Sequence, residues 1–127
     1  MRSKGLEVSW SLPMEDEPYG LTVESVQCVA ENNCTLIITV DCGISEYKEI
    51  AYAREKGIDT IVLDHHNPRK ELPEAKAIIN PKVEDSGYPF KDLAGCAVTA
   101  KVIWAFRFSE FDMYNQPICL LNVRPGN

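Results

Sequence analysis

Two short apolar stretches, each running into an aspartate, constrain the fold of this chain more than any other feature. Residues 35–40 read TLIITV and residues 59–63 read DTIVL, and both are β-branched and too short to be helices of their own. Apolar runs of this length are typical of strands buried on both faces of a parallel sheet. Asp41 directly follows the first stretch and Asp64 the second.

The residues between these two strands predict a helix. Ser45 can serve as its N-cap, Glu46 and Glu49 lie in its first turns, and it extends to about Lys56. Gly57 stands just past its expected end, where glycine is favoured. The order strand, helix, strand therefore predicts a βαβ unit.

This βαβ unit places the two aspartates side by side. Its right-handed crossover joins parallel strands, so both strand ends lie at the same edge of one sheet. Asp41 is then expected beside Asp64, His65 and His66, the last two being the only histidines of the chain. Ligands bind at this carboxyl edge in open α/β sheets, so the pattern predicts a site there.

Further segments fit an α/β chain. Residues 7–12 alternate like a short strand, Thr22 can cap a helix over about 23–31, and residues 76–80, KAIIN, predict a third strand of the sheet. Residues 114–127 show no clear organisation.

A last helix is predicted from about Gly95 to Phe108. Its apolar residues recur every three or four positions, which indicates a buried face; they are Val98, Val102, Ile103 and Phe106, with Trp104 and Phe108 beside them. We expect these aromatic residues and Trp10 to lie in a core or a domain interface rather than to stack on nucleic-acid bases.

Length and composition indicate one ordinary globular domain of 127 residues, with 45% hydrophobic and 25% charged residues. No apolar run is long enough to cross a bilayer and the first residues lack a signal peptide, so we expect a cytoplasmic protein without membrane contact. The five scattered cysteines lack any C-x-x-C pair, which predicts reduced thiols. Nothing in the sequence sets an oligomeric state.

The net charge of -6 disfavours direct binding of nucleic acid, because phosphate contacts require Lys and Arg. Metal ions held by acidic side chains would supply positive charge, as would basic surfaces elsewhere in a longer protein. Carboxylates with imidazoles at a sheet edge suit Mn²⁺ or Mg²⁺. A histidine pair alone is more often a surface or capping feature, and on the residues alone this alternative stays open.

Four stretches carry a family resemblance, in the order LIITVDCGIS, EIAYAREKGIDTIVLDHH, LPEAKAIINPK and YPFKDLAGCAVTAKV. Over about residues 5–108 the chain resembles the DHH phosphoesterase superfamily and, within it, the RecJ-like single-stranded-DNA-specific exonucleases. The resemblance implies a three-layer α/β/α domain with a parallel sheet. It also implies a two-metal phosphodiesterase that uses Mn²⁺ or Mg²⁺ to remove nucleotides from the 5′ end of single-stranded DNA, and a single-stranded-DNA-binding protein as a partner.

The same resemblance implies a role for each site residue. Asp41 matches a ligand able to bridge both metal ions, and His65 matches another metal ligand. His66 matches the histidine near the scissile phosphate, where it would stabilise charge or assist the leaving group, and Asp64 would support the site. Gly95 matches the glycine-rich turn that opens a helix, where backbone N–H groups can approach phosphate.

The chain also departs from the family pattern. It has no D-x-D-x-D-G motif ahead of Asp41, the surroundings of Asp112 do not match the family's fourth-motif aspartate, and Ala97 and Pro18 stand where glycine is frequent. We therefore expect residues 1–127 to be a partial DHH domain, with its core at about 5–108 and the start of a following segment at 109–127, and to be inactive by itself.

Two other classes of function remain open. Relatives with DHH sites hydrolyse oligonucleotides, cyclic dinucleotides or pyrophosphate, and the motifs separate these activities imperfectly. VDCGIS and the INPK and YPFK segments favour the exonuclease branch. A non-catalytic remnant is the second alternative, because the expected ligand set is incomplete.

Overall fold

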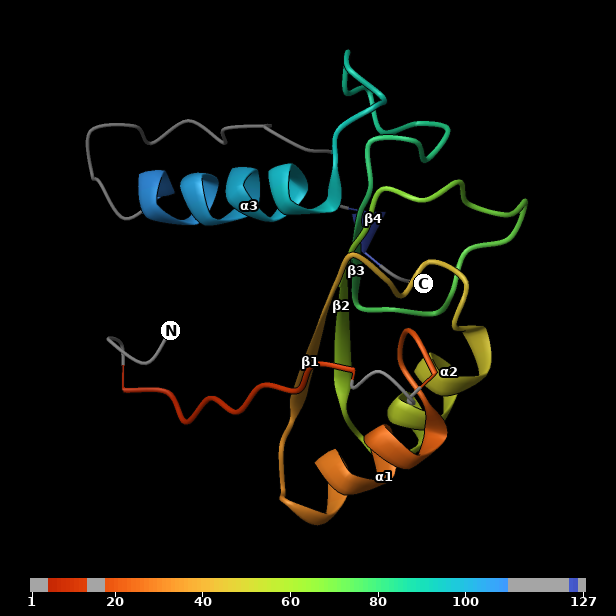
Figure 1. Cartoon of the computed structure of the whole chain (residues 1–127), viewed down its shortest axis with the longest axis vertical. Coiled ribbons are helices and arrows are strands. Elements are labelled where there is room, and N and C mark those ends of the chain that lie inside the picture. Colours follow the sequence, from red (N-terminus) through yellow and green to blue (C-terminus); the bar gives the residue numbers. More distant parts are fainter. Residues whose placement is uncertain (1–4, 14–17, 110–123, 126–127) are drawn as a thin grey trace.

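A computed structural model of the chain describes residues 5–13, 18–109 and 124–125. The strands form one sheet in the order β1-β2-β3-β4, with α1 and α2 on one face and α3 on the other (Figure 1). The strands are β1 (Leu36–Val40), β2 (Asp59–Leu63), β3 (Ala77–Ile79) and β4 (Arg124–Pro125), and the helices are α1 (Val23–Glu31), α2 (Tyr47–Glu55) and α3 (Gly95–Ser109). The predicted α/β fold with a parallel sheet between helices is confirmed.

The pairing of β1 with β2 is parallel, as the βαβ pattern predicted. Val40 lies opposite Leu63 at the ends of the two strands. β3 is parallel to β2, and β4 pairs antiparallel with β3. The two residues of β4 are the described part of a tail in which the sequence showed no organisation.

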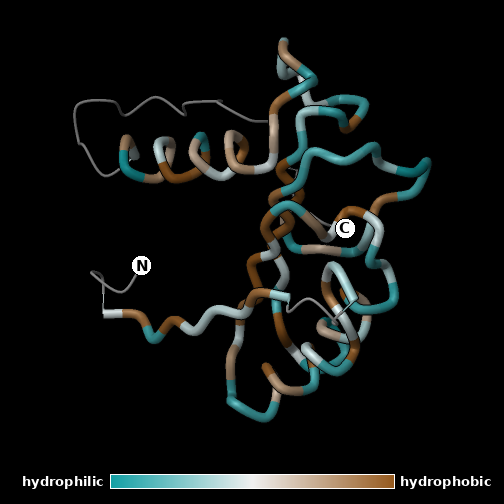
Figure 2. Tube along the Cα trace, viewed as in Figure 1, coloured by the Kyte–Doolittle hydropathy of each residue, from teal (hydrophilic) through white to brown (hydrophobic). Residues whose placement is uncertain are grey.

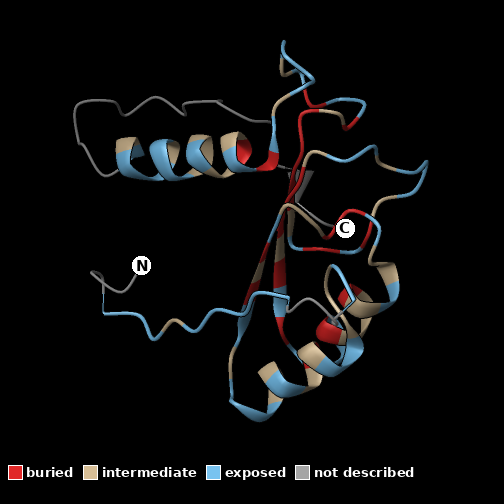
Figure 3. Ribbon diagram, viewed as in Figure 1, coloured by how far each residue is buried: buried red, intermediate tan, exposed pale blue. Residues whose placement is uncertain are grey.

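Both faces of the sheet are packed against helices. On one face Val62 and Ile78 pack with Ile44 and Ile50, and further along this face Ile37, Val26, Ala53 and Ile58 form a second cluster. On the other face Leu63 and Ile79 contact Val98 of α3. The apolar and buried residues therefore follow the central strands, whereas most of α3 beyond its first turn is at least partly exposed (Figures 2 and 3).

The two helix starts differ in how well the sequence predicted them. Thr22 caps α1: its hydroxyl accepts from the Ser25 N–H at 3.1 Å, and the Ser25 hydroxyl accepts from the Thr22 N–H at 3.0 Å. Ser45 does not cap α2, whose N-cap is Glu46. The Glu46 carboxylate instead accepts from the N–H groups of Gly43 at 2.8 Å and Ser45 at 3.0 Å, so it satisfies the loop before the helix.

The structure contradicts one expectation about apolar segments and half of another. Residues 7–12 form no strand, and Trp10 within them is 75% exposed. The aromatic residues of α3 are not in the core of the described part, because Trp104 is 46% and Phe106 is 59% exposed. Trp104 packs edge-to-face on Phe108, with ring centroids 5.2 Å apart. A domain interface for this face of α3 stays a prediction.

Other expectations concern cysteines and membranes. The four cysteines in the described residues are free, and Cys119, like Asp112, lies outside those residues. None of the helices in the described ranges is long and apolar enough to cross a bilayer.

Val98 should carry most of the packing of α3 on the sheet, because it is fully buried whereas Ile103 is 53% exposed. We expect Val98→Ala to lower the free energy of unfolding by about 2 kcal/mol through lost burial and a residual cavity. Ile103→Ala, the control, should change it by less than about 0.5 kcal/mol. Urea unfolding of both variants measures this, and equal losses would contradict the assignment.

Candidate metal centre

The ends of β1 and β2 bring an aspartate and two histidines together. His65 Nε2 lies 3.1 Å from Asp41 Oδ1. Asp41, His65 and His66 each offer one ligand atom, and these atoms lie within 4.8 Å of one another. The parallel crossover alone had predicted this neighbourhood from the sequence. The arrangement exposes all three side chains in part, so an ion or a substrate could reach them.

Asp41 adopts an unusual backbone conformation where β1 ends. Its φ is +64°, in the left-handed region that residues other than glycine seldom adopt. Its N–H donates to the Leu63 carbonyl at 2.8 Å, and its own carbonyl accepts a hydrogen bond from the Tyr19 hydroxyl. The backbone of Asp41 is thus held by β2 on one side and by Tyr19 on the other.

Asp64 is in a different environment, although it also follows a strand. It is 1% exposed. Its Oδ2 accepts from the Ile44 N–H at 3.0 Å, and its Oδ1 accepts from the N–H groups of His65 at 2.7 Å and His66 at 3.2 Å. Burial by itself raises the pKa of Asp64, but these hydrogen bonds, with that from the His66 ring, outweigh it and hold the pKa below its usual value.

The ionised Asp64 sets the orientation of His66. His66 Nδ1 lies 2.6 Å from Asp64 Oδ1, and because a carboxylate can only accept, Nδ1 carries the proton. The Nε2 atom is then left for a metal or a substrate. Asn80 holds the same residue from the other side, since its side chain donates to the His66 carbonyl at 2.9 Å. Asp64 therefore acts here as a support for His66.

The residues fit a divalent cation. Asp41 Oδ1 is buried and has no hydrogen-bond donor, even though His65 Nε2 is 3.1 Å away. This contact has the length of an ion pair but not the geometry of a hydrogen bond, so the oxygen and the ring nitrogen lie side by side. A cation bound by both atoms would satisfy the buried oxygen, and a carboxylate with an imidazole is a donor pair that Mn²⁺ accepts.

Gly95 shapes the other side of the Asp41 carboxylate. A Cβ built on Gly95 would lie 2.0 Å from Asp41 Oδ1 and 2.9 Å from Asp41 Cβ. Only glycine lets the start of α3 approach so closely, and rotation of the Asp41 side chain could not relieve both contacts. Gly95, for which the family resemblance implied a phosphate contact, thus lies next to the proposed metal ligand Asp41.

Cys42 follows Asp41 but does not supply a thiolate. Burial, followed by the negative charges of Glu46 and Asp64, raises the pKa of the Cys42 thiol to about 11. The thiol is therefore protonated at neutral pH and is not an activated nucleophile.

Sequence reasoning missed three residues around the site, Tyr19, Glu46 as a loop acceptor, and Asn80. Asn80 had a signal, since it follows the third strand as Asp41 and Asp64 follow the first two. For Tyr19 no local pattern predicted the contact with Asp41, because 22 positions separate the two residues.

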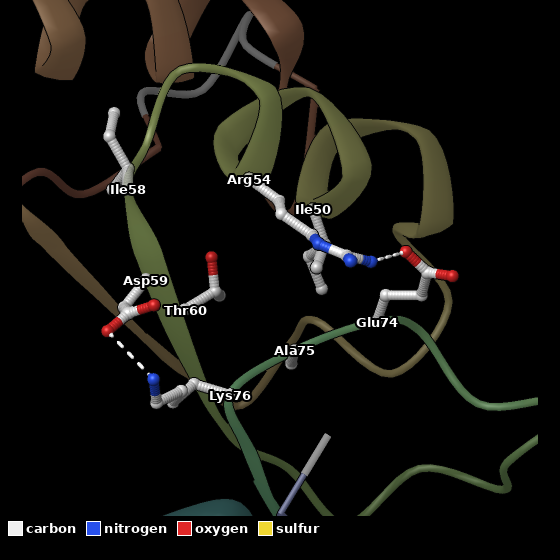
Figure 4. Close-up of a pocket in the computed structure, with 8 residues that line it drawn as sticks. All are labelled: Ile50, Arg54, Ile58, Asp59, Thr60, Glu74, Ala75 and Lys76. Carbon is white, nitrogen blue, oxygen red and sulfur yellow. Dashed lines mark hydrogen bonds and ion pairs between the residues drawn. The ribbon is translucent and has the colours of Figure 1, made fainter. Parts of the chain in front are cut away.

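A separate cleft of about 190 Å³ lies at the opposite, amino end of β2 (Figure 4). Ion pairs Arg54–Glu74 and Lys76–Asp59 flank it, and the Thr60 hydroxyl on its wall is buried without a partner. The paired charges cancel and no histidine lines the cleft, so it does not provide the chemistry found at the carboxyl edge.

Comparison with known proteins identifies the family of the chain. Residues 4–121 match the model of the DHH family, N-terminal domain. The chain is 44% identical over 89 residues to the single-stranded-DNA-specific exonuclease RecJ of Bacillus subtilis, a match that covers 70% of this chain and 11% of the relative. It is 41% identical over 109 residues to RecJ of Escherichia coli, covering 84% of this chain and 19% of the relative.

The solved structures similar to this chain are also RecJ exonucleases. A crystal structure of exonuclease RecJ bound to manganese superposes with a TM-score of 0.60 at 32% identity, over 74% of this chain and 23% of that one. RecJ of Thermus thermophilus in complex with Mn²⁺ superposes with a TM-score of 0.58 at 31% identity, over 69% of this chain and 13% of that one. The chain thus spans less than a quarter of each of these proteins.

Replacing Gly95 should disturb Asp41 directly. We expect Gly95→Ala to lower the free energy of unfolding by about 1–3 kcal/mol, because the new Cβ overpacks against the Asp41 carboxylate even though alanine favours a helix. Cys96→Ala is the control, since Cys96 is exposed on the same turn. Urea unfolding and the ¹H–¹⁵N shift of Asp41 report the effect; a stable variant with an unshifted Asp41 would contradict this packing.

Proposed function

The chain belongs to the DHH family, and from this premise we propose that it forms part of the catalytic domain of a metal-dependent 5′→3′ single-stranded-DNA exonuclease. The observation that carries the proposal is the convergence of Asp41, His65 and His66 at the carboxyl ends of β1 and β2. The identity of about 40% to curated RecJ exonucleases supports this branch of the family.

In the proposed site, Asp41 and His65 hold Mn²⁺ or Mg²⁺, and His66 adjoins the scissile phosphate. Two such ions, when bound, lower the pKa of water and stabilise the attacking and leaving oxygens. His66 donates its Nδ1 proton to Asp64, which leaves its Nε2 atom for the reacting phosphate group. A proton on Nε2 could pass to the leaving 3′ oxygen, and the Asp64 carboxylate would stabilise the imidazolium before this transfer.

The proposed substrate contact is at Gly95, where the first turn of α3 meets Asp41. The N–H groups at a helix start can approach a phosphate oxygen. Bound cations, with basic surfaces elsewhere in the full-length protein, would offset the net charge of -6. We assign residues 5–108 to the catalytic core and 109–127 to the following segment.

A cytoplasmic location and a single-stranded-DNA-binding protein as partner are also part of the proposal. The free thiols support the location, because oxidising compartments favour disulfides. The partner rests on the family resemblance alone.

Asp41→Asn in the full-length parent is expected to lower exonuclease turnover at least about 100-fold, because the neutral amide is a poor ligand for a divalent cation. Asp59→Asn is the matched control: Asp59 lies at the other end of the same βαβ unit and pairs with Lys76 in solvent. Degradation of 5′-labelled single strands, with circular dichroism to check the fold, measures both. Full activity of the Asp41→Asn enzyme would remove Asp41 from the mechanism.

The 127-residue chain by itself should bind Mn²⁺ weakly and show little or no nuclease activity. Its described part groups three ligand atoms, whereas two ions need several more. Calorimetric titration with Mn²⁺ and a nuclease assay on the same sample test this. Micromolar binding together with turnover would show that these residues suffice.

A further inference from the structure

Residues Tyr19 and Gly20 lie across the loop that follows β1 and carries Asp41. We infer that Tyr19 is a positioning residue, whose hydroxyl holds Asp41 in the backbone conformation that presents its carboxylate to the metal. The inference rests on the proposed function for the role of Asp41, but the contact itself involves only residues of this chain.

The Tyr19 contact is made by its hydroxyl. The hydroxyl donates to the Asp41 carbonyl, while the residue as a whole is 64% exposed. An exposed ring gains little from burial, so packing does not explain why it lies here. Removal of the hydroxyl alone should therefore test the contact without leaving a cavity.

Asp41 needs such a contact because its conformation is strained. A φ of +64° is unfavourable for a residue with a side chain and persists only where the surroundings hold it. The hydrogen bond from the Asp41 N–H to Leu63 fixes the peptide before the Cα atom, and the bond from Tyr19 fixes the peptide after it. Together they determine where the carboxylate points.

Gly20 makes a second contact between the same segment and the loop, independent of Tyr19. Its φ is +98°, and a Cβ there would lie 2.6 Å from Glu46 Oε1. The Glu46 carboxylate cannot move away freely, because its other oxygen accepts from the N–H groups of Gly43 and Ser45. Tyr19 and Gly20 therefore contact both ends of the loop from residue 41 to residue 46.

The first experiment compares Tyr19→Phe with Tyr47→Phe in the 127-residue chain without metal. Tyr47 is the matched control, since its hydroxyl also donates to a loop carbonyl, that of Glu71, at 2.7 Å. Loss of one hydrogen bond should speed amide hydrogen exchange at Asp41 by roughly three- to tenfold in the Tyr19→Phe variant. The Tyr47→Phe variant should leave exchange at Asp41 close to the wild-type rate.

The second experiment measures the Mn²⁺ dependence of exonuclease activity in the full-length parent. Tyr19→Phe should raise the Mn²⁺ concentration for half-maximal activity several-fold and restore most of the turnover at saturating Mn²⁺, whereas Tyr47→Phe should leave both unchanged. This split between metal affinity and maximal rate distinguishes positioning of a ligand from general loss of structure.

A pair of glycine variants tests the contact of Gly20 with Glu46. Gly20→Ala should speed exchange at Gly43 and Ser45, because its Cβ displaces Glu46. Gly57→Ala is the control, because Gly57 also has a positive φ of +74° but a Cβ there would meet no atom within 4 Å. Equal changes of amide exchange at Gly43 in the two variants would show only backbone strain and would contradict the contact of Gly20 with Glu46.

The outcomes separate the inference from the proposed function. Unchanged exchange at Asp41 in the Tyr19→Phe variant, or an equal change in the Tyr47→Phe variant, overturns the positioning role. Faster exchange with unchanged Mn²⁺ dependence overturns its link to the metal. A parent without metal-dependent exonuclease activity would refute the proposed function, and the exchange data would still decide whether Tyr19 holds Asp41.

Discussion

The parallel pairing of β1 with β2 is the interaction on which the rest of the site depends. It aligns Val40 with Leu63 and lets the Asp41 N–H bond to the Leu63 carbonyl. A slip of one residue would move Asp41 by about 3.3 Å and reverse the faces of every strand side chain. Ile37 and Val62, two of the buried residues of these strands, oppose this slip because they would face the wrong layer.

Two aspartates in equivalent positions acquire different properties from their surroundings. Asp64 is buried, ionised and fully engaged by hydrogen bonds from the loop after β1 and from the histidines that follow it. Asp41 is half exposed and has a buried oxygen without a donor. Ionised and already saturated, Asp64 orients His66, whereas the unsatisfied Asp41 is suited to bind a cation. The strand ends supply the carboxylates, and the hydrogen bonds divide their roles.

The sequence predicted what depends on local patterns and failed where distant residues decide. Apolar β-branched runs indicated β1 and β2, and their parallel pairing followed from the crossover rule. Thr22 was predictable because a cap involves neighbours in the chain. The role of Glu46 was not predictable, because its carboxylate turns back and accepts hydrogen bonds from the preceding loop. Glu46, and not Ser45, is therefore the N-cap of α2. The contact of Tyr19 with Asp41 has no periodic signal at all.

The aromatic face of α3 shows the same limit of local sequence patterns, and the position of this helix affects the metal site. A helix that is apolar on most sides is expected to be covered, yet in the described part α3 meets the sheet mainly through Val98 and its first turn. That first turn begins at Gly95, in contact with the Asp41 carboxylate. Any shift of α3 along the sheet would thus press on the proposed ligand. The position of α3 on the sheet is therefore part of what shapes the metal centre, although α3 lies far along the chain from Asp41.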